Sequence, residues 1–339
     1  MQERINKHFK LIIVLLSIIL IFSMIILMSV GRYHIAIADI FKYFGTFLGF
    51  NSNAIDSNVS IVLLNIRLPR ILLAVMVGSS LSLAGSTYQS VFHNPLASPD
   101  IIGVSSGACF GAALAILFNL PSVMITVSAF CFSLITVVIV YFVSLYTKGS
   151  KITALILVGI MIGALFSAAT SYIKLVADPD NQLPAITYWM MGSLASSSIS
   201  DVILSIVPIS ICSVILLLIR WRINLLSLSD EEALSMGIDV GKLRLLCIIL
   251  ASLLTAASIS VSGMIGWIGL IIPNLARKLV GDNSSKIMPL SMLMGGLFLP
   301  IIDGFARNLL PTEIPIGILN AFIGAPFFIS LLIGGDRRQ

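Results

Sequence analysis

Apolar runs of about 20 residues recur along the whole chain and are separated by short polar segments. A helix needs about 20 apolar residues to cross a hydrocarbon layer roughly 30 Å thick. Turn-forming residues lie in the breaks, as at Asn94-Pro95 and Ser98-Pro99. The pattern predicts about ten membrane-spanning helices, at residues 11–30, 68–91, 101–119, 122–147, 152–176, 201–219, 245–264, 266–280, 287–306 and 315–333. We therefore expect an all-α polytopic membrane protein with a single transmembrane domain over residues 1–339.

The composition agrees with this pattern. Hydrophobic residues make up 58% of the chain and charged residues 10%, whereas a soluble domain has roughly 25% charged residues. The mean hydropathy is +1.07, which excludes a soluble enzyme. The net charge of +5 comes from Lys and Arg scattered at segment ends, so a nucleic-acid partner is not expected. All four cysteines lie in apolar stretches without a CxxC pair, and we interpret them as core residues.

The basic residues also predict the topology. Arg4, Lys7 and Lys10 precede the first apolar run, which is too long for a signal peptide and is not followed by a small-residue cleavage site. We expect it to be a retained first span that starts in the cytoplasm. Ten spans then return the C-terminus to the cytoplasm and place 14 of the 20 Lys and Arg inside, as the positive-inside rule requires.

Two blocks of four spans have opposite orientations in this topology. Equivalent helices of spans two to five and spans seven to ten are five spans apart, so the second block crosses the membrane in the opposite sense. Each block has an Arg shortly before an apolar helix and a break that combines Pro with Asn, at Asn94-Pro95 and Pro273-Asn274. The sequence therefore predicts an inverted repeat, an architecture that recurs in transporters.

Catalytic chemistry is not predicted. The three His residues lie far apart, so no metal or proton-relay pair is expected, and the chain has no GxxxxGK[ST] phosphate-binding loop. The spans contain few ionisable residues, although proton- or sodium-coupled carriers usually place such residues near the midplane. The energy for transport is therefore expected to come from elsewhere. An ion-coupled secondary carrier is the alternative from a different class, and an intramembrane enzyme is a more distant one.

The longest predicted cytoplasmic connection is the stretch at about 222–244. Ser229 and Glu232 have the spacing of a capping box, Leu228 and Ala233 that of a hydrophobic staple, and Gly237 is placed to end a helix. These signals predict a short amphipathic helix at the membrane surface. A solvated turn is the alternative.

Three arginines are expected on the opposite side. Arg67 and Arg70 share one helix face at the outer mouth of span two and are expected to be exposed; Arg307 follows Asp303 by four residues. The simplest interpretations are interfacial snorkelling for the first two and a helical salt bridge between Asp303 and Arg307. The other interpretation is an electrostatic dock for an acidic partner.

Several motifs resemble one known family. The string RLPRILLAVMVGSSLSLAGSTYQSVFHNPLASPDIIGVSSGA starts the match, and TYWMMGSLA, LLSLSDEEALSMGIDVGKLR, SGMIGWIGLIIPNLARKLVG and PIIDGFARNLLPTEIPIGILNAFIGAPFFISLLI follow in order. Together they resemble the FecCD family, the permease subunits of type II ABC importers for iron–siderophore complexes, haem and vitamin B12. Two departures are Pro273-Asn274, where the family often has His after Pro, and Trp267, where Phe is usual.

The resemblance implies a set of partners and sites. The permease would pair with a second permease subunit, two ATP-binding cassette subunits that bind ATP and Mg, and an extracytoplasmic substrate-binding protein; the chain itself would hold no cofactor or metal. The family further implies docking of the binding protein at Arg67, Arg70 and Arg307. It implies a cytoplasmic gate at Gly149, Ser150, Lys151 and Thr153, and contacts with the ATPase at Asp230, Glu231, Glu232, Ala233, Gly237, Lys242 and Arg244.

An iron–siderophore complex is the cargo that we expect, with haem, cobalamin and molybdate as alternatives that the same resemblance leaves open. A path for a bulky chelate works best with weakly interacting walls, and the few charges in the spans agree with this. Selectivity would then lie mainly in the external binding protein.

Overall fold

The computed structural model describes residues 2–31, 33, 35–47, 57–147, 150–226 and 230–335. These residues form helices and no strand. In chain order the helices are α1 Gln2–Ser29, α2 Ile37–Phe47, α3 Ser57–Ile61, the π-helix η1 Val62–Arg67, α4 Leu68–Val91, the 3₁₀-helix η2 Pro99–Ile102, α5 Val104–Leu117, α6 Ser122–Leu145, α7 Lys151–Val176, α8 Gln182–Met190, α9 Ile199–Leu225, α10 Asp230–Ser235, α11 Val240–Ser262, α12 Ile268–Val280, α13 Ser284–Asn308 and α14 Ile316–Gly335.

The predicted spans are confirmed as helices. α1, α4, α5, α6, α7, α9, α11, α12, α13 and α14 match the ten predicted ranges in order. Among the described residues, seven helical segments are long and apolar enough to cross a membrane, and α5 and α14 contain shorter apolar helices. The bounds differ from the predicted ones at the helix ends, and side-chain caps begin α9, α11 and α13 before the predicted positions. α11, for example, begins at Val240 rather than at 245 because Asp239 caps it.

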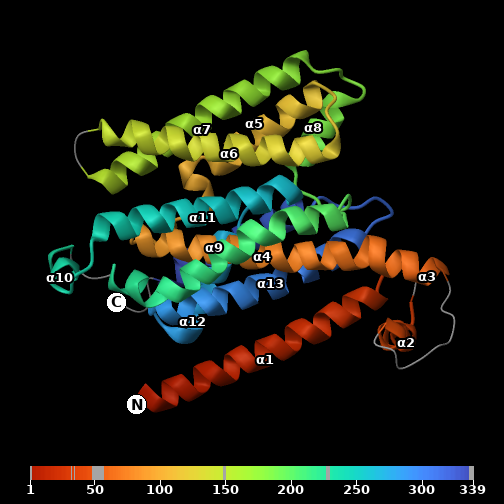
Figure 1. Ribbon diagram of the computed structural model, residues 1–339, viewed down its shortest axis with the longest axis horizontal. Helices are drawn as coiled ribbons and strands as arrows, with labels where there is room; N and C mark the ends of the chain where they lie inside the picture. Colours follow the sequence, from red (N-terminus) through yellow and green to blue (C-terminus); the bar gives the residue numbers. More distant parts are fainter. Residues whose placement is uncertain are drawn as a thin grey trace.

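The two blocks of the predicted inverted repeat interlock. α4, the first helix of the first block, packs against α12 and α13 of the second block. Conversely, α11 packs against α5 and α6 of the first block, and α4 and α11 also contact each other near the centre of the bundle (Figure 1). In each block the second helix, α5 or α12, is the shortest. The fold is therefore an all-α bundle with the expected inverted repeat.

Glycine pairs allow the interlocked helices to approach closely. A Cβ on Gly85 would overlap the backbone carbonyl of Gly269, and a Cβ on Gly78 would overlap that of Gly295. Helices in lipid associate through close packing of small residues because water does not drive them together.

Buried polar groups link the same helices. The Tyr88 hydroxyl lies 2.7 Å from the Ser252 hydroxyl, which joins α4 to α11. The Asn274 amide donates to the carbonyl of Pro95 over 2.9 Å. The two motifs that combine Pro with Asn, one in each block, therefore contact each other, and Asn274 fixes the turn that follows α4. The predicted break at Pro273-Asn274 is wrong, because both residues lie inside α12.

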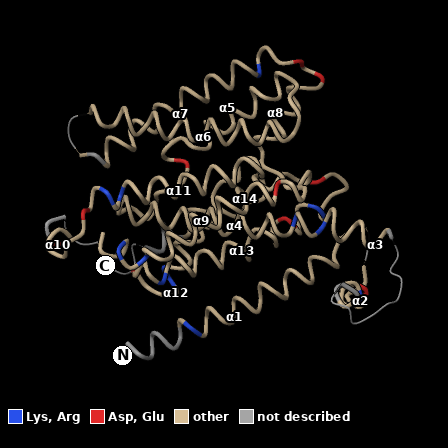
Figure 2. The backbone as a smooth tube through the Cα atoms, in the orientation of Figure 1, with Lys and Arg blue, Asp and Glu red and all other residues tan. Residues whose placement is uncertain are grey.

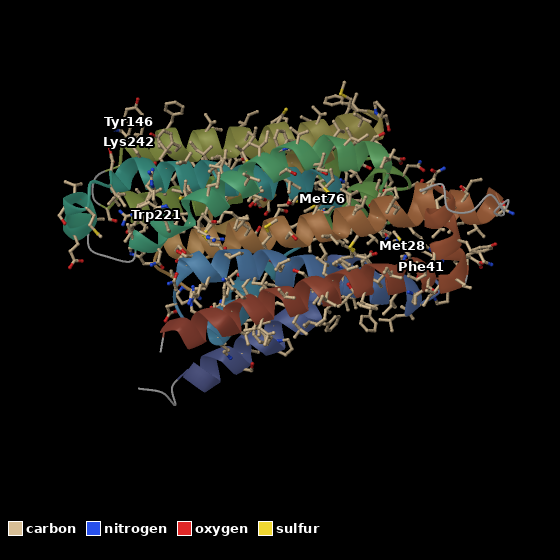
Figure 3. The ribbon with its side chains drawn as sticks, turned by 60° about the horizontal axis from the view of Figure 1, so that its bottom comes forward. Met28, Phe41, Met76, Tyr146, Trp221 and Lys242 are labelled. Carbon is tan, nitrogen blue, oxygen red and sulfur yellow. The ribbon has the colours of Figure 1, made fainter. Side chains whose placement is uncertain are left out.

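The two ends of the bundle contain different helices (Figure 1). One end, called the α10 end below, contains α10, the start of α1 and the end of α14; the other, called the α2 end, contains α2 and α3. Figure 2 shows most charged residues near these two ends. Figure 3 places Tyr146, Trp221 and Lys242 at the α10 end and Met28 and Phe41 at the α2 end. The intervening helices are apolar, as expected for hydrocarbon contact.

Candidate functional site

The arginines predicted in span two lie at a change of helix type at the α2 end. α3, η1 and α4 are continuous in sequence, and η1 is π-helical over Val62–Arg67. Pro69, in the first turn of α4, has no backbone N–H to donate to the carbonyl four residues earlier. A locally wider helical turn accommodates such a missing bond. Arg67 and Arg70 project from this junction.

Arg70 forms a double ion pair with two carboxylates. Its Nη2 lies 2.8 Å from Asp303 Oδ1, and its Nε lies 3.0 Å from both carboxylate oxygens of Asp303. On the other side of the guanidinium, Nη1 and Nη2 donate to Glu313 over 3.0 and 2.9 Å. Arg70 is 6% exposed and Asp303 2%. The planar guanidinium fork therefore connects α4, α13 and the loop before α14.

Arg67 and Arg307 hold the end of α1. Arg67 donates to the carbonyls of Met28, Ser29 and Tyr33. Arg307 donates to the carbonyl of Leu27 over 2.6 Å. The last carbonyls of a helix have no partner within the helix and carry partial negative charge, so both arginines satisfy and neutralise the C-terminal turn of α1.

These contacts correct two of the sequence predictions. The expectation that Arg67 and Arg70 are exposed is wrong, because they are 4% and 6% exposed. The predicted helical salt bridge between Asp303 and Arg307 is also wrong, since Asp303 faces α4 and pairs with Arg70. The physical reason is the close packing of α4 on α13, which brings a guanidinium within reach of a carboxylate that would otherwise pair along its own helix. Docking of a binding protein at these arginines stays a prediction.

Glu313 is the member of this cluster that the sequence predictions missed. It lies in the loop between α13 and α14. Its side chain is 29% exposed, whereas that of Asp303 is 2% exposed. The local signal was an acidic residue between two prolines, in the string PTEIP. Its partner lies 243 residues earlier in the chain, which no local pattern indicates.

The predicted short helix at the α10 end is present as α10. Gly237 ends it with φ +79°. Its N–H donates to Leu234 and the N–H of Ile238 to Ala233, which is the Schellman arrangement. The prediction that Gly237 ends this helix is thus confirmed. The predicted partners Leu228 and Ser229 lie outside the described residues, and the side chains of Asp230 and Glu231 are likewise outside the description.

α10 buries little of its own surface. Ala233 is 1% exposed and packs into the core cluster around the start of α11. By contrast, Leu234 and Met236 are 67% and 60% exposed. Exposed apolar side chains on a short helix outside the spans are typical of a protein contact surface.

Asp239 then starts α11. Its carboxylate accepts the backbone N–H of Lys242 over 3.1 Å and lies 3.0 Å from the Lys242 ammonium. The hydrogen bond from the Lys242 backbone, with help from the ammonium, lowers the pKa of Asp239 below its usual value. Lys242 and Arg244 follow in the first turns of α11.

A cavity of about 400 Å³ lies between this segment and the start of α7, and neither Ser150 nor Thr153 of the predicted gate lines it. Asp239, Lys242 and Arg244 line one side, and Thr147 and Ile152, next to the turn between α6 and α7, line another. Ser150 is the residue before α7, and Thr153 is exposed in its first turn. Gly149 lies outside the described residues, as does the side chain of Lys151. The segment that starts α11 and the turn that starts α7 therefore border one hollow.

One further carboxylate, exposed in the single chain, lies in η2, level with the middle of α4. Asp100, in η2, accepts a hydrogen bond from Ser105 and borders a small hollow with Leu81, near the middle of α4. Trp267 borders the same hollow and stacks its ring edge-on against Phe328 at 6.5 Å. Asp100 was not among the residues predicted from the sequence, because Asp100 adjoins a turn and does not interrupt an apolar run.

The comparisons with known proteins agree with this arrangement. The model of the FecCD transport family matches residues 18–334. The molybdate import system permease protein of Haemophilus influenzae is 40% identical over 315 residues, covering 92% of each chain. A probable iron chelatin transport system permease protein of Helicobacter pylori is 42% identical over 276 residues, covering 81% of this chain and 83% of the relative.

A solved structure extends the similarity to the whole fold. It is described as an inward-facing conformation of a metal-chelate type ABC transporter and is 39% identical to this chain. The two superimpose with a TM-score of 0.86, covering 95% of this chain and 99% of the other. The sequence motifs, the inverted repeat and the matched length lead to one conclusion: the chain belongs to the FecCD transport family of ABC importer permeases.

Proposed function

We propose that this permease carries an iron–siderophore complex across the cytoplasmic membrane, driven by ATP hydrolysis in partner subunits. The observation that carries the mechanism is the hollow bordered both by the start of α11 and by the turn that starts α7. A displacement of α10 can be transmitted to the start of α7 through the residues that line this hollow. The similarity to a permease named for iron chelatin transport supports the choice of cargo.

The α10 end would face the cytoplasm. Arg220, Arg222, Lys242, Arg277 and Lys286 lie at helix ends on this side, which agrees with the positive-inside rule. Two ATPase subunits, which bind ATP and Mg, would contact Leu234 and Met236 of α10. A second permease subunit would complete the path.

The α2 end would receive the substrate-binding protein. Because Arg67, Arg70 and Arg307 are buried and already bonded within the chain, an acidic partner would have to displace an internal acceptor. Glu313 is the most accessible of these acceptors, since its side chain is 29% exposed. We therefore propose that a carboxylate of the binding protein competes with Glu313 for Arg70.

Molybdate is the second candidate cargo. The Haemophilus influenzae permease named for molybdate import covers more of this chain than the iron chelatin relative does. Both cargoes fit a path with few charged side chains, so the residues that line the permease do not distinguish between them.

Uptake in cells that lack the chain tests the proposal. The cells are complemented with wild-type protein or with empty vector, and radioactive iron is supplied as a ferric siderophore and radioactive molybdate in parallel. Iron accumulation that depends on the chain and on ATP is the expected result. Accumulation of molybdate alone would show that the cargo is molybdate rather than an iron–siderophore complex. Accumulation of neither by an assembled complex would contradict both assignments.

A further inference from the structure

A two-part groove lies between α6 and α9 on the side of α11. α6 and α9 both pack against α11, and the space between them is lined by residues of all three helices. The inner part has a volume of about 390 Å³ and the part toward the α2 end about 490 Å³. Thr126, Ser260 and Val261 line both parts, so the groove is continuous.

The part toward the α2 end is the more polar of the two. Hydroxyl and amide side chains line it, together with the rings of Tyr188 and Trp189 from α8 and the carboxylate of Asp201 from the first turn of α9. Among the described residues that line either part, Asp201 is the only charged one, and none is Lys, Arg or His. The local charge therefore favours a cationic group and disfavours an anionic one.

Asp201 has a fixed position in this pocket. Its backbone N–H donates to the Ser198 hydroxyl and its side chain accepts the Ser198 backbone N–H, which forms the capping box of α9. Its Oδ2 accepts the backbone N–H and the hydroxyl of Ser198 over 2.9 and 2.7 Å. Both of these bonds use the same oxygen. Oδ1 is left for a ligand in the pocket, whose lining also includes the rings of Tyr188 and Trp189; aromatic rings attract ammonium groups.

The inner part of the groove is apolar. Phe130 of α6, Leu204 and Val207 of α9 and Ala257 of α11 line it. Pro208 also lies there, inside α9, where its ring replaces a backbone N–H. Val207 is 57% exposed, and this helix lies in a segment long and apolar enough to span a membrane. Polarity therefore falls from the bundle end toward its middle, in the same direction as in one leaflet of a bilayer.

We propose that this groove binds a phospholipid with a primary ammonium head group, such as phosphatidylethanolamine, in the leaflet at the α2 end. The ammonium would lie between Asp201 and the rings of Tyr188 and Trp189. One acyl chain would fill the apolar part between α6 and α9. The negative charge of the lining would favour this lipid over an anionic lipid of the same shape. The apolar inner part would favour it over a water-soluble amine.

Native mass spectrometry of the full chain, released from nanodiscs with equal amounts of phosphatidylethanolamine and phosphatidylglycerol, tests the proposal. We expect about tenfold preferential retention of phosphatidylethanolamine, the ratio that a desolvated cation–π contact with a carboxylate supports. Asp201→Asn keeps an acceptor for the capping box but removes the charge, so it should abolish the preference without unfolding α9. Soluble glycerophosphoethanolamine should not displace the lipid.

A second pair of variants tests the acyl part. Val207→Trp fills the groove from an exposed position, and Val214→Trp places the same ring on an exposed part of α9 that does not line it. Lipid retention should fall about tenfold in the first variant and stay unchanged in the second. Equal retention of both lipids by wild-type protein, or unchanged retention in Val207→Trp, would overturn the proposal. So would a cross-link from a cysteine at position 207 to a second copy or to a partner subunit in the native membrane.

Discussion

The guanidinium of Arg70 lies 2.8 Å from the carboxylate of Asp303, although 233 residues separate them in the chain. This pair joins α4 to α13 at the α2 end, and Glu313 completes it from the following loop. Because both Arg70 and Asp303 are buried, the pair is a structural connection of the bundle as well as part of the predicted docking site.

Asp303→Ala should destabilise the protein strongly. Removing one partner of a buried ion pair leaves the other charge poorly compensated, which costs about 3–5 kcal/mol. Glu313→Gln is the matched control, because Glu313 is partly exposed and its loss should cost about 1 kcal/mol. Thermal unfolding in the same detergent measures both. Equal melting temperatures for the two variants would contradict the structural role of Asp303.

Gly85→Ala should destabilise the contact between the two blocks. The added Cβ would overlap the carbonyl of Gly269, and overpacking of this kind costs about 1–3 kcal/mol or more. Gly266→Ala, three residues from Gly269, places its Cβ in open space and should be nearly neutral. The melting temperatures of the two variants check this, and a neutral Gly85→Ala would show that α4 and α12 are less closely packed.

Gly237→Val should uncouple ATP hydrolysis from transport if α10 contacts the ATPase. A Cβ there would touch nothing within 4 Å, but φ is +79°, and a left-handed conformation costs a residue with a Cβ roughly 1–2 kcal/mol. The end of α10 should therefore unwind. The measurements are ATPase stimulation and uptake in the reconstituted complex.

Gly241→Ala is the control for this variant. Gly241 lies in the first turn of α11, without a positive φ, and its Cβ would meet only Asp239 at an ordinary 3.5 Å. Normal uptake by both variants would reduce the segment to a linker. Glu232→Lys should weaken ATPase docking in the same assay, because it reverses a charge on the exposed side of α10.

Acid should loosen the start of α11. The hydrogen bond from Lys242 lowers the pKa of Asp239 in the folded protein, so this carboxylate stabilises the helix start above its unfolded pKa of about 3.9. That contribution is lost as pH falls through the lowered folded pKa. Proteolysis between α10 and α11 by an acid-active protease, measured from pH 5 downward, should accelerate in wild-type protein. In Asp239→Asn, which caps without titrating, the rate should lack this pH-dependent component.

The local signals in the sequence were sufficient to predict the spanning helices and the C-terminal cap of α10. A spanning helix is determined by the length of its own apolar run, so the ten ranges were predictable without knowing their neighbours. Gly237 was predictable because a C-terminal cap depends on the few residues around it. The order of quoted motifs indicated the family, which the comparisons confirm.

Contacts between distant segments were decided only by the tertiary structure. Asp303 has Arg307 four residues away, yet it pairs with Arg70 because α4 packs closely on α13 at Gly78 and Gly295. The groove between α6 and α9 likewise exists only because both helices pack on α11. A spacing in the sequence shows which side chains can meet along one helix. Which side chains do meet depends on how closely two helices approach, and small residues hundreds of positions apart determine that together.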